Sequence, residues 1–66
     1  MNNAQFLELV AKNSRSSIAI IDAIVQRGAI KGEELSTVGG LRDDHVKVIG
    51  EVEERQQELD DEEEEE

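Results

Sequence analysis

The sequence predicts an all-α protein: a small helical hairpin or three-helix arrangement with a long C-terminal helix and a disordered acidic tail. Apolar residues recur at intervals of three and four residues, glycines stand where helices would begin and end, and the chain has no proline. We place a single small helical domain over residues 1–59 and the tail over residues 60–66.

The first helix is expected over residues 4–12, with Asn2 or Asn3 as its N-cap. Residues 13–17 follow as a polar stretch whose serine and asparagine side chains compete for backbone hydrogen bonds. We therefore expect a break or kink there. The alternative is a polar turn within one continuous helix.

A second helix is expected from about residue 16 to residue 27, because Ile18, Ile21 and Val25 lie on one helical face. The density of isoleucine and valine alone would also permit a strand. Arg27 followed by Gly28 favours the helix, since it places a cation and a conformationally free residue at the C-terminus.

The third helix begins after Gly32, which is an acceptable N-cap, and carries two carboxylates in its first turn. Adjacent glycines at 39 and 40 cost a helix interior roughly 2 kcal/mol relative to alanine. We expect them to separate a short helix (33–38) from a long one (41 to about 60). The alternative is that they allow a close helix crossing. An apolar seam continues along the segment: Leu35, Val38, Leu41, His45, Val48, Val52 and Leu59.

The expected core draws on all three helices and the connection between the last two. Burying these side chains against one another would give the short chain its stability. Its members are Phe6, Leu9, Val10, Ile18, Ile21, Ile24, Val25, Ile30, Leu35, Val38 and Leu41.

The net charge of −10 lies in the last quarter of the chain. Residues 1–50 carry six basic and six acidic side chains, whereas residues 51–66 carry eleven carboxylates and Arg55 alone. Residues 60–66 are consecutive carboxylates, which repel one another and oppose the negative end of a helix dipole. A disordered interaction tail is therefore expected.

The composition argues against several classes of function. A chain of 66 residues leaves little room for a pocket, so we expect no enzyme and no cofactor. It has no cysteine, and His45 with scattered carboxylates makes no metal site. Residues 1–50 have no basic excess for direct nucleic-acid binding. The apolar run 18–25 is too short to cross a membrane. We expect a soluble protein that is cytoplasmic when synthesised.

The C-terminal half of the long helix is expected to project beyond the core, which would leave Val52 and Leu59 without intramolecular partners. This end is either a frayed helix or a docking surface for a second copy or for a partner with a basic or apolar surface. The candidate partner-binding residues are Val48, Val52, Leu59, Asp60, Asp61, Glu62, Glu63, Glu64, Glu65 and Glu66.

Residues 27–43 contain R-G-A, then E-E-L, then V-G-G-L-R-D. This stretch resembles small acidic helical accessory proteins of tailed-bacteriophage virions. The resemblance implies a virion-associated protein that decorates the capsid or assists its assembly, with a capsid protein as its partner. The alternative function is an acidic inhibitor that imitates nucleic acid and occupies a basic groove of a host enzyme. A third is a scaffolding factor whose tail shields a basic client.

Overall fold

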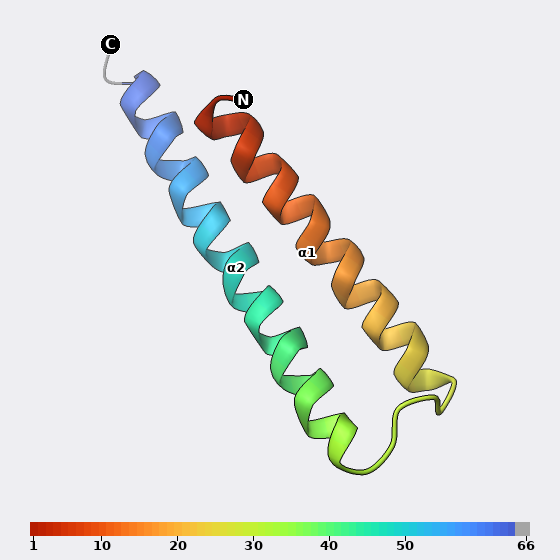
Figure 1. The fold of residues 1–66 in the computed structure, drawn as a ribbon. Coiled ribbons are helices and arrows are strands. Elements are labelled where there is room, and N and C mark those ends of the chain that lie inside the picture. Colours follow the sequence, from red (N-terminus) through yellow and green to blue (C-terminus); the bar gives the residue numbers. More distant parts are fainter. Residues whose placement is uncertain (65–66) are drawn as a thin grey trace.

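Two long antiparallel helices make up the fold in a computed structural model, which describes residues 1–64. Helix α1 spans Asn3–Gln26 and helix α2 spans Glu33–Glu64, and the two lie side by side along their length (Figure 1). The rod measures 53 × 17 × 16 Å. Within residues 1–64 there is no strand, so the all-α prediction is confirmed. The hairpin is the correct alternative, and the three-helix arrangement is wrong.

Helix α1 begins with a reciprocal cap. The Asn2 side chain accepts a hydrogen bond of 2.8 Å from the Gln5 backbone N–H. The Gln5 side chain in turn accepts one of 3.0 Å from the Asn2 backbone N–H. Because this capping box satisfies donors that the first helical turn leaves free, it fixes where α1 starts. The expected N-cap at Asn2 is confirmed.

Helix α1 continues without interruption through residues 13–17, so the expected break is wrong. Serine and asparagine cost only about half a kcal/mol each in a helix interior, and no proline or glycine occurs between residues 3 and 26. Packing against α2 outweighs this cost, because Ser14 is buried in the contact and hydrogen-bonded to His45 of α2. The two short helices expected over residues 4–27 are one helix.

The C-terminus of α1 is closed by Gly28, whose φ of 74° is favourable for glycine. The Gly28 N–H donates to the Val25 carbonyl at 3.0 Å, and the Ala29 N–H donates to the Ile24 carbonyl at 3.3 Å. These two bonds form a Schellman motif. The predicted helix end at Arg27–Gly28 is confirmed, and the chain then turns back toward α2.

Helix α2 is also continuous, and the break expected at Gly39–Gly40 is wrong. A Cβ placed on either glycine would meet no atom within 4 Å, so these residues do not permit a close helix crossing either. Two glycines cost the helix roughly 2 kcal/mol. Packing of the two helices offsets this cost, since Val38 is half-buried and Arg42 hydrogen-bonds Asp22 of α1.

The tail expected to be disordered from residue 60 is helical through Glu64, while Glu65 and Glu66 lie outside the described residues. The helix therefore runs through the expected domain boundary at residue 59. Leu59 packs against the core, and the Gln57 amide donates to Asp61 at 3.1 Å. Asp60 and Glu62 also lie close to the N-terminus of α1. The positive end of that helix dipole counteracts the repulsion between the carboxylates.

The core is much smaller than expected. Leu7, Ala11 and Val52 are the buried hydrophobic residues within residues 1–62, and Val10, Val48 and Leu59 pack partly buried against them. Five predicted core residues are exposed, namely Phe6, Leu9, Val25, Leu35 and Leu41. The other six are half-buried: Val10, Ile18, Ile21, Ile24, Ile30 and Val38. Two helices can cover only one stripe of each other, so most apolar residues of α1 remain accessible.

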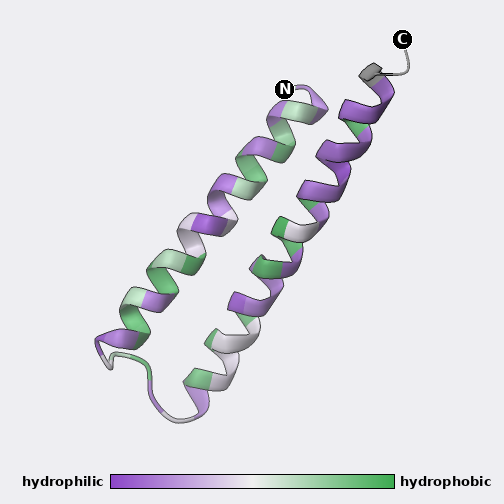
Figure 2. Cartoon of the chain, turned by 180° about the vertical axis from the view of Figure 1, so that it is seen from behind, coloured by the Kyte–Doolittle hydropathy of each residue, from purple (hydrophilic) through white to green (hydrophobic). Residues whose placement is uncertain are grey.

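The helix contact follows one seven-residue repeat on each helix. On α1 the contact positions are 7, 11, 14, 18 and 21, and on α2 they are 38, 42, 45, 49, 52, 56 and 59. Alternating steps of four and three residues are typical of coiled-coil packing. Figure 2 shows that hydrophobic residues occur along the whole of α1, while the C-terminal part of α2 is hydrophilic. Neither helix is long and apolar enough to span a membrane over the part of the chain searched.

Substitutions at two glycines should act in opposite directions. Gly40→Ala lies at an exposed helical position with free space around it, so it should raise the free energy of unfolding by about 1 kcal/mol. Gly28→Ala should lower it, because alanine is strained at a φ of 74°. Urea unfolding followed by circular dichroism measures both. A lower stability for Gly40→Ala would contradict a continuous α2.

Candidate interaction surface

The interior of the hairpin contains a polar pair midway along the rod. Ser14 is 3% exposed, and its Oγ lies 3.2 Å from Nδ1 of the half-buried His45. A buried hydroxyl without a partner would be costly, so this hydrogen bond favours the register that brings the two residues together. The two residues are 31 positions apart in the sequence, and neither the pairing nor the register follows from local pattern.

A serine beside a histidine invites comparison with a nucleophile and its base. The Ser14 hydroxyl is enclosed between the helices, and the hydrogen bond uses Nδ1 of His45. A hydrolytic site also requires a group that orients the histidine and donors that stabilise an oxyanion. Asp43 and Asp44, the neighbours of His45 in sequence, are exposed on other faces of α2. The arrangement supports a structural role for the pair.

Ion pairs join the helices along one side of the rod, which we call the polar face. Arg42 donates from Nε and Nη2 to the two carboxylate oxygens of Asp22, at 2.8 and 3.2 Å. Arg15 lies 4.0 Å from Glu53 on the same side. Glu8 precedes Arg15 by seven residues, as Arg15 precedes Asp22, so all three lie in one row.

The bidentate pair also changes the acidity of its members. Hydrogen bonding from Arg42 lowers the pKa of Asp22, and this outweighs the opposing effect of desolvation. The Asp22 carboxylate correspondingly raises the pKa of Arg42. Both groups are therefore charged at neutral pH. The pair fixes the C-terminal end of α1, which leads into the connection (residues 27–32), relative to α2. Because both side chains are partly exposed, solvent screens the attraction between them.

The opposite side of the rod, which we call the apolar face, exposes hydrophobic side chains from both helices. A groove between the helices is lined by Phe6, Leu7 and Val10 of α1 and by Val48 and Val52 of α2, with Lys47, Glu51 and Arg55 at its edge. Helix α1 extends the face with Ile20 and Ile24, and α2 extends it with Leu41, two turns before Val48. Phe6 is 55% exposed, Ile20 60% and Leu41 50%.

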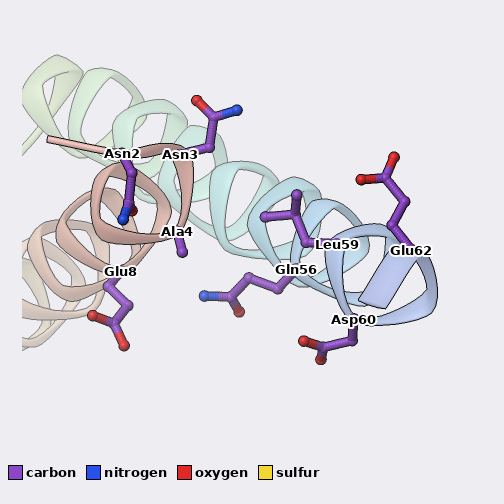
Figure 3. Close-up of a pocket in the computed structure, with 8 residues that line it drawn as sticks. All are labelled: Asn2, Asn3, Ala4, Glu8, Gln56, Leu59, Asp60 and Glu62. Atoms are coloured by element: carbon purple, nitrogen blue, oxygen red, sulfur yellow. The ribbon is translucent and has the colours of Figure 1, made fainter. Parts of the chain in front are cut away.

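The open end of the rod is acidic. A polar hollow of about 710 Å³ lies between the start of α1 and the last turns of α2 (Figure 3). It is lined by Asn2, Asn3, Ala4, Glu8, Gln56, Leu59, Asp60 and Glu62. We call the exposed residues Asp60, Asp61 and Glu62 the acidic end. Across the part of the chain searched, no group of three potential metal ligands converges, and the hollow has the form of an open surface.

The structure separates the predicted partner-binding residues into two groups. Val52 is 4% exposed and, with Leu59, packs in the contact between helices, so the expectation that both lack intramolecular partners is wrong. Val48 is half-buried at the edge of the apolar face. Asp60, Asp61 and Glu62 are exposed. Glu63 and Glu64 continue the helix, and Glu65 and Glu66 lie outside the described residues.

Sequence reasoning assigned Phe6 and Leu41 to the core and omitted Ile20 from both core and surface. A signal for the apolar face is nevertheless present in α1. Positions 6, 10, 13, 17, 20 and 24 form a second seven-residue repeat, displaced by one residue from the contact stripe. The apolar members of this second repeat lie beside the contact with α2 and so contribute to the surface of α1.

Comparison with known proteins adds no relative: no protein-family model matches the chain, and neither a curated protein nor a solved structure is significantly similar to it.

The contribution of the Asp22–Arg42 pair should depend on pH in one direction. Because the folded state lowers the pKa of Asp22 from its ordinary value of 3.8, the stabilisation is fully present above that value. It is lost as the pH falls through the lower pKa of the folded protein. The free energy of unfolding of the parent should exceed that of Asp22→Asn at pH 7, and the difference should shrink in acid. Chemical unfolding at a series of pH values measures it, and a difference that grows in acid would contradict the assignment.

Proposed function

We propose that the chain is a non-enzymatic helical interaction protein, which acts by contacting other protein surfaces. The observation that carries the proposal is the exposure of large apolar residues on a rod only two helices wide, among them Phe6, Ile20 and Leu41 of the apolar face. Contiguous exposed hydrophobic side chains are typical of surfaces that another protein covers. The polar groups inside the hairpin pair with one another, which leaves the surface as the part available for function.

The acidic end is a second contact surface within this proposal. Its carboxylates are exposed and lie at the C-terminus of α2, where the helix dipole adds to the negative potential. A basic protein surface is the complementary partner. Such an attraction speeds association and weakens with salt, because mobile ions screen exposed charges beyond about 8 Å.

Within this class, we favour an accessory protein of a phage virion that decorates the capsid or assists its assembly. Support comes from the resemblance over residues 27–43, which form the connection and the first turns of α2. An inhibitor that imitates nucleic acid would present carboxylates at regular spacing along the rod. The excess of negative charge gathers instead at one end of α2, which favours the accessory function.

Quantitative mass spectrometry of purified particles tests the virion assignment. Particles of the phage or prophage whose genome carries the gene would be purified by density gradient, and the chain would be counted relative to the major capsid protein. A decoration protein is expected in many copies per particle. Absence from both mature particles and assembly intermediates would contradict the assignment.

The acidic end should determine the salt dependence of binding to such particles. Neutralising it with Asp60→Asn, Asp61→Asn and Glu62→Gln should weaken binding on the order of tenfold at low salt, since exposed charge pairs contribute modestly. The difference should vanish at high salt. A matched control removes three exposed carboxylates at the other end of α2, with Glu33→Gln, Glu34→Gln and Asp43→Asn. Co-sedimentation measures both, and equal losses would contradict a specific acidic contact.

A further inference from the structure

The apolar face has a regular composition on α1. Positions 6, 13 and 20 are exposed, and positions 10, 17 and 24 are half-buried, so the stripe is centred to the side of the contact with α2. Its members are Phe6, Val10, Asn13, Ser17, Ile20 and Ile24. The outer edge of α2 on this face carries Asp44, Glu51 and Glu58 and is therefore polar. Helix α1 supplies most of the hydrophobic surface.

The surface area of the chain indicates how large a missing contact is. The chain exposes 5296 Å², whereas a compact monomer of its mass exposes about 4,200 Å². The excess of about 1,100 Å² per copy, counted over two copies, falls within the roughly 2,000–5,000 Å² that obligate homodimers bury. The elongated rod therefore leaves more surface uncovered than a compact domain does, and the excess is compatible in size with a contact to a second copy.

The stripe on α1 is also complementary to itself. In an antiparallel pair of α1 helices centred on residue 15, Phe6 would lie opposite Ile24 of the other copy, and Val10 opposite Ile20. Asn13 would lie opposite Ser17. Apolar residues thus meet apolar residues, and the amide meets the hydroxyl in the middle. A twofold interface requires such reciprocity: if one residue contacts a second residue of the other copy, the second residue also contacts the first residue of the other copy.

The charge distribution selects the relative direction of the two copies. If both connections lay at the same end of the dimer, the two acidic ends would lie together and repel each other. In that arrangement Phe6 and Val10 of one copy would also face the polar edge of α2 of the other copy. With the connections at opposite ends, the acidic ends are separated by most of the 53 Å rod. Each acidic end then lies near the exposed Arg27 and Lys31 of the other copy.

We infer that two copies of the chain pair through their apolar faces, with the connections at opposite ends, to form an antiparallel four-helix bundle. Helix α1 packs on α1 of the second copy. The inference rests on the proposed function, because it names a second copy of the chain as the protein that covers the apolar face, and it concerns a different surface from the acidic end. The two are tested with different variants, so either can fail without the other.

The first test is the mass of the full chain in solution by sedimentation equilibrium. The expected result is twice 7.4 kDa at micromolar concentration. Ile20→Glu should raise the dimer dissociation constant by at least about tenfold, because it places a charge in an apolar contact. Ala19→Glu is the matched control, since Ala19 is the exposed neighbour on the polar side of α1. A monomer at all concentrations, or equal effects of both variants, would overturn the inference.

The second test fixes the orientation and does not depend on a destabilised variant. The chain has no cysteine, so Phe6→Cys and Ile24→Cys can be introduced together without background. These positions lie about 27 Å apart on one helix and cannot form a disulfide within a copy. Oxidation should give a covalent dimer, and mixing the two single variants should give one as well. Glu8→Cys with Gln26→Cys, which has the same spacing on the polar face, should remain uncrosslinked. A dimer by mass that forms no 6–24 disulfide would overturn the opposite-end arrangement.

Discussion

The structure depends on the fact that each of two paired helices can cover only one stripe of the other. The covered stripe here holds three buried apolar side chains, half-buried apolar residues such as Ile18 and Ile49, and polar residues such as Ser14 and His45. Ala11 lets the helices approach, while Ser14 pairs with His45 and Asp22 with Arg42. The limited burial leaves hydrophobic surface on α1 accessible, and that surface is the basis of the proposed contacts with other proteins.

The ends of α1 could be predicted from sequence because they depend on nearby residues. Asn2 and Gln5 cap one end, and Gly28 closes the other, each through groups within five positions. The continuity of α1 through residue 14 could not be predicted in this way. It depends on packing against α2, in which Ser14 pairs with a histidine 31 positions away, and local pattern contains no information about that partner.

The choice of the covered face was also beyond the sequence pattern. Helix α1 carries two seven-residue repeats one position apart, and either could have faced α2. The outcome is set by α2, whose residues 42, 45 and 56 bring an arginine, a histidine and a glutamine into the contact. Sequence reasoning gave weight to hydrophobic residues and so assigned Phe6 and Leu41 to the core. The run of carboxylates from residue 60 can be recognised in the sequence, but the apolar face could not be predicted, because the residues expected to dock, Val52 and Leu59, lie in the contact between the helices.

The start of α1 and the end of α2 lie at the same end of the rod (Figure 1). A mechanical load applied between them would therefore open the hairpin like a zipper. The packing of Leu59 would part first, then that of Leu7 and Val52. The Ser14–His45 hydrogen bond would follow, and the Asp22–Arg42 pair near the connection would part last. Each layer would bear the force alone, so a single hairpin would yield at low tension. The same rod pulled from its connection and its open end would resist along the axes of both helices.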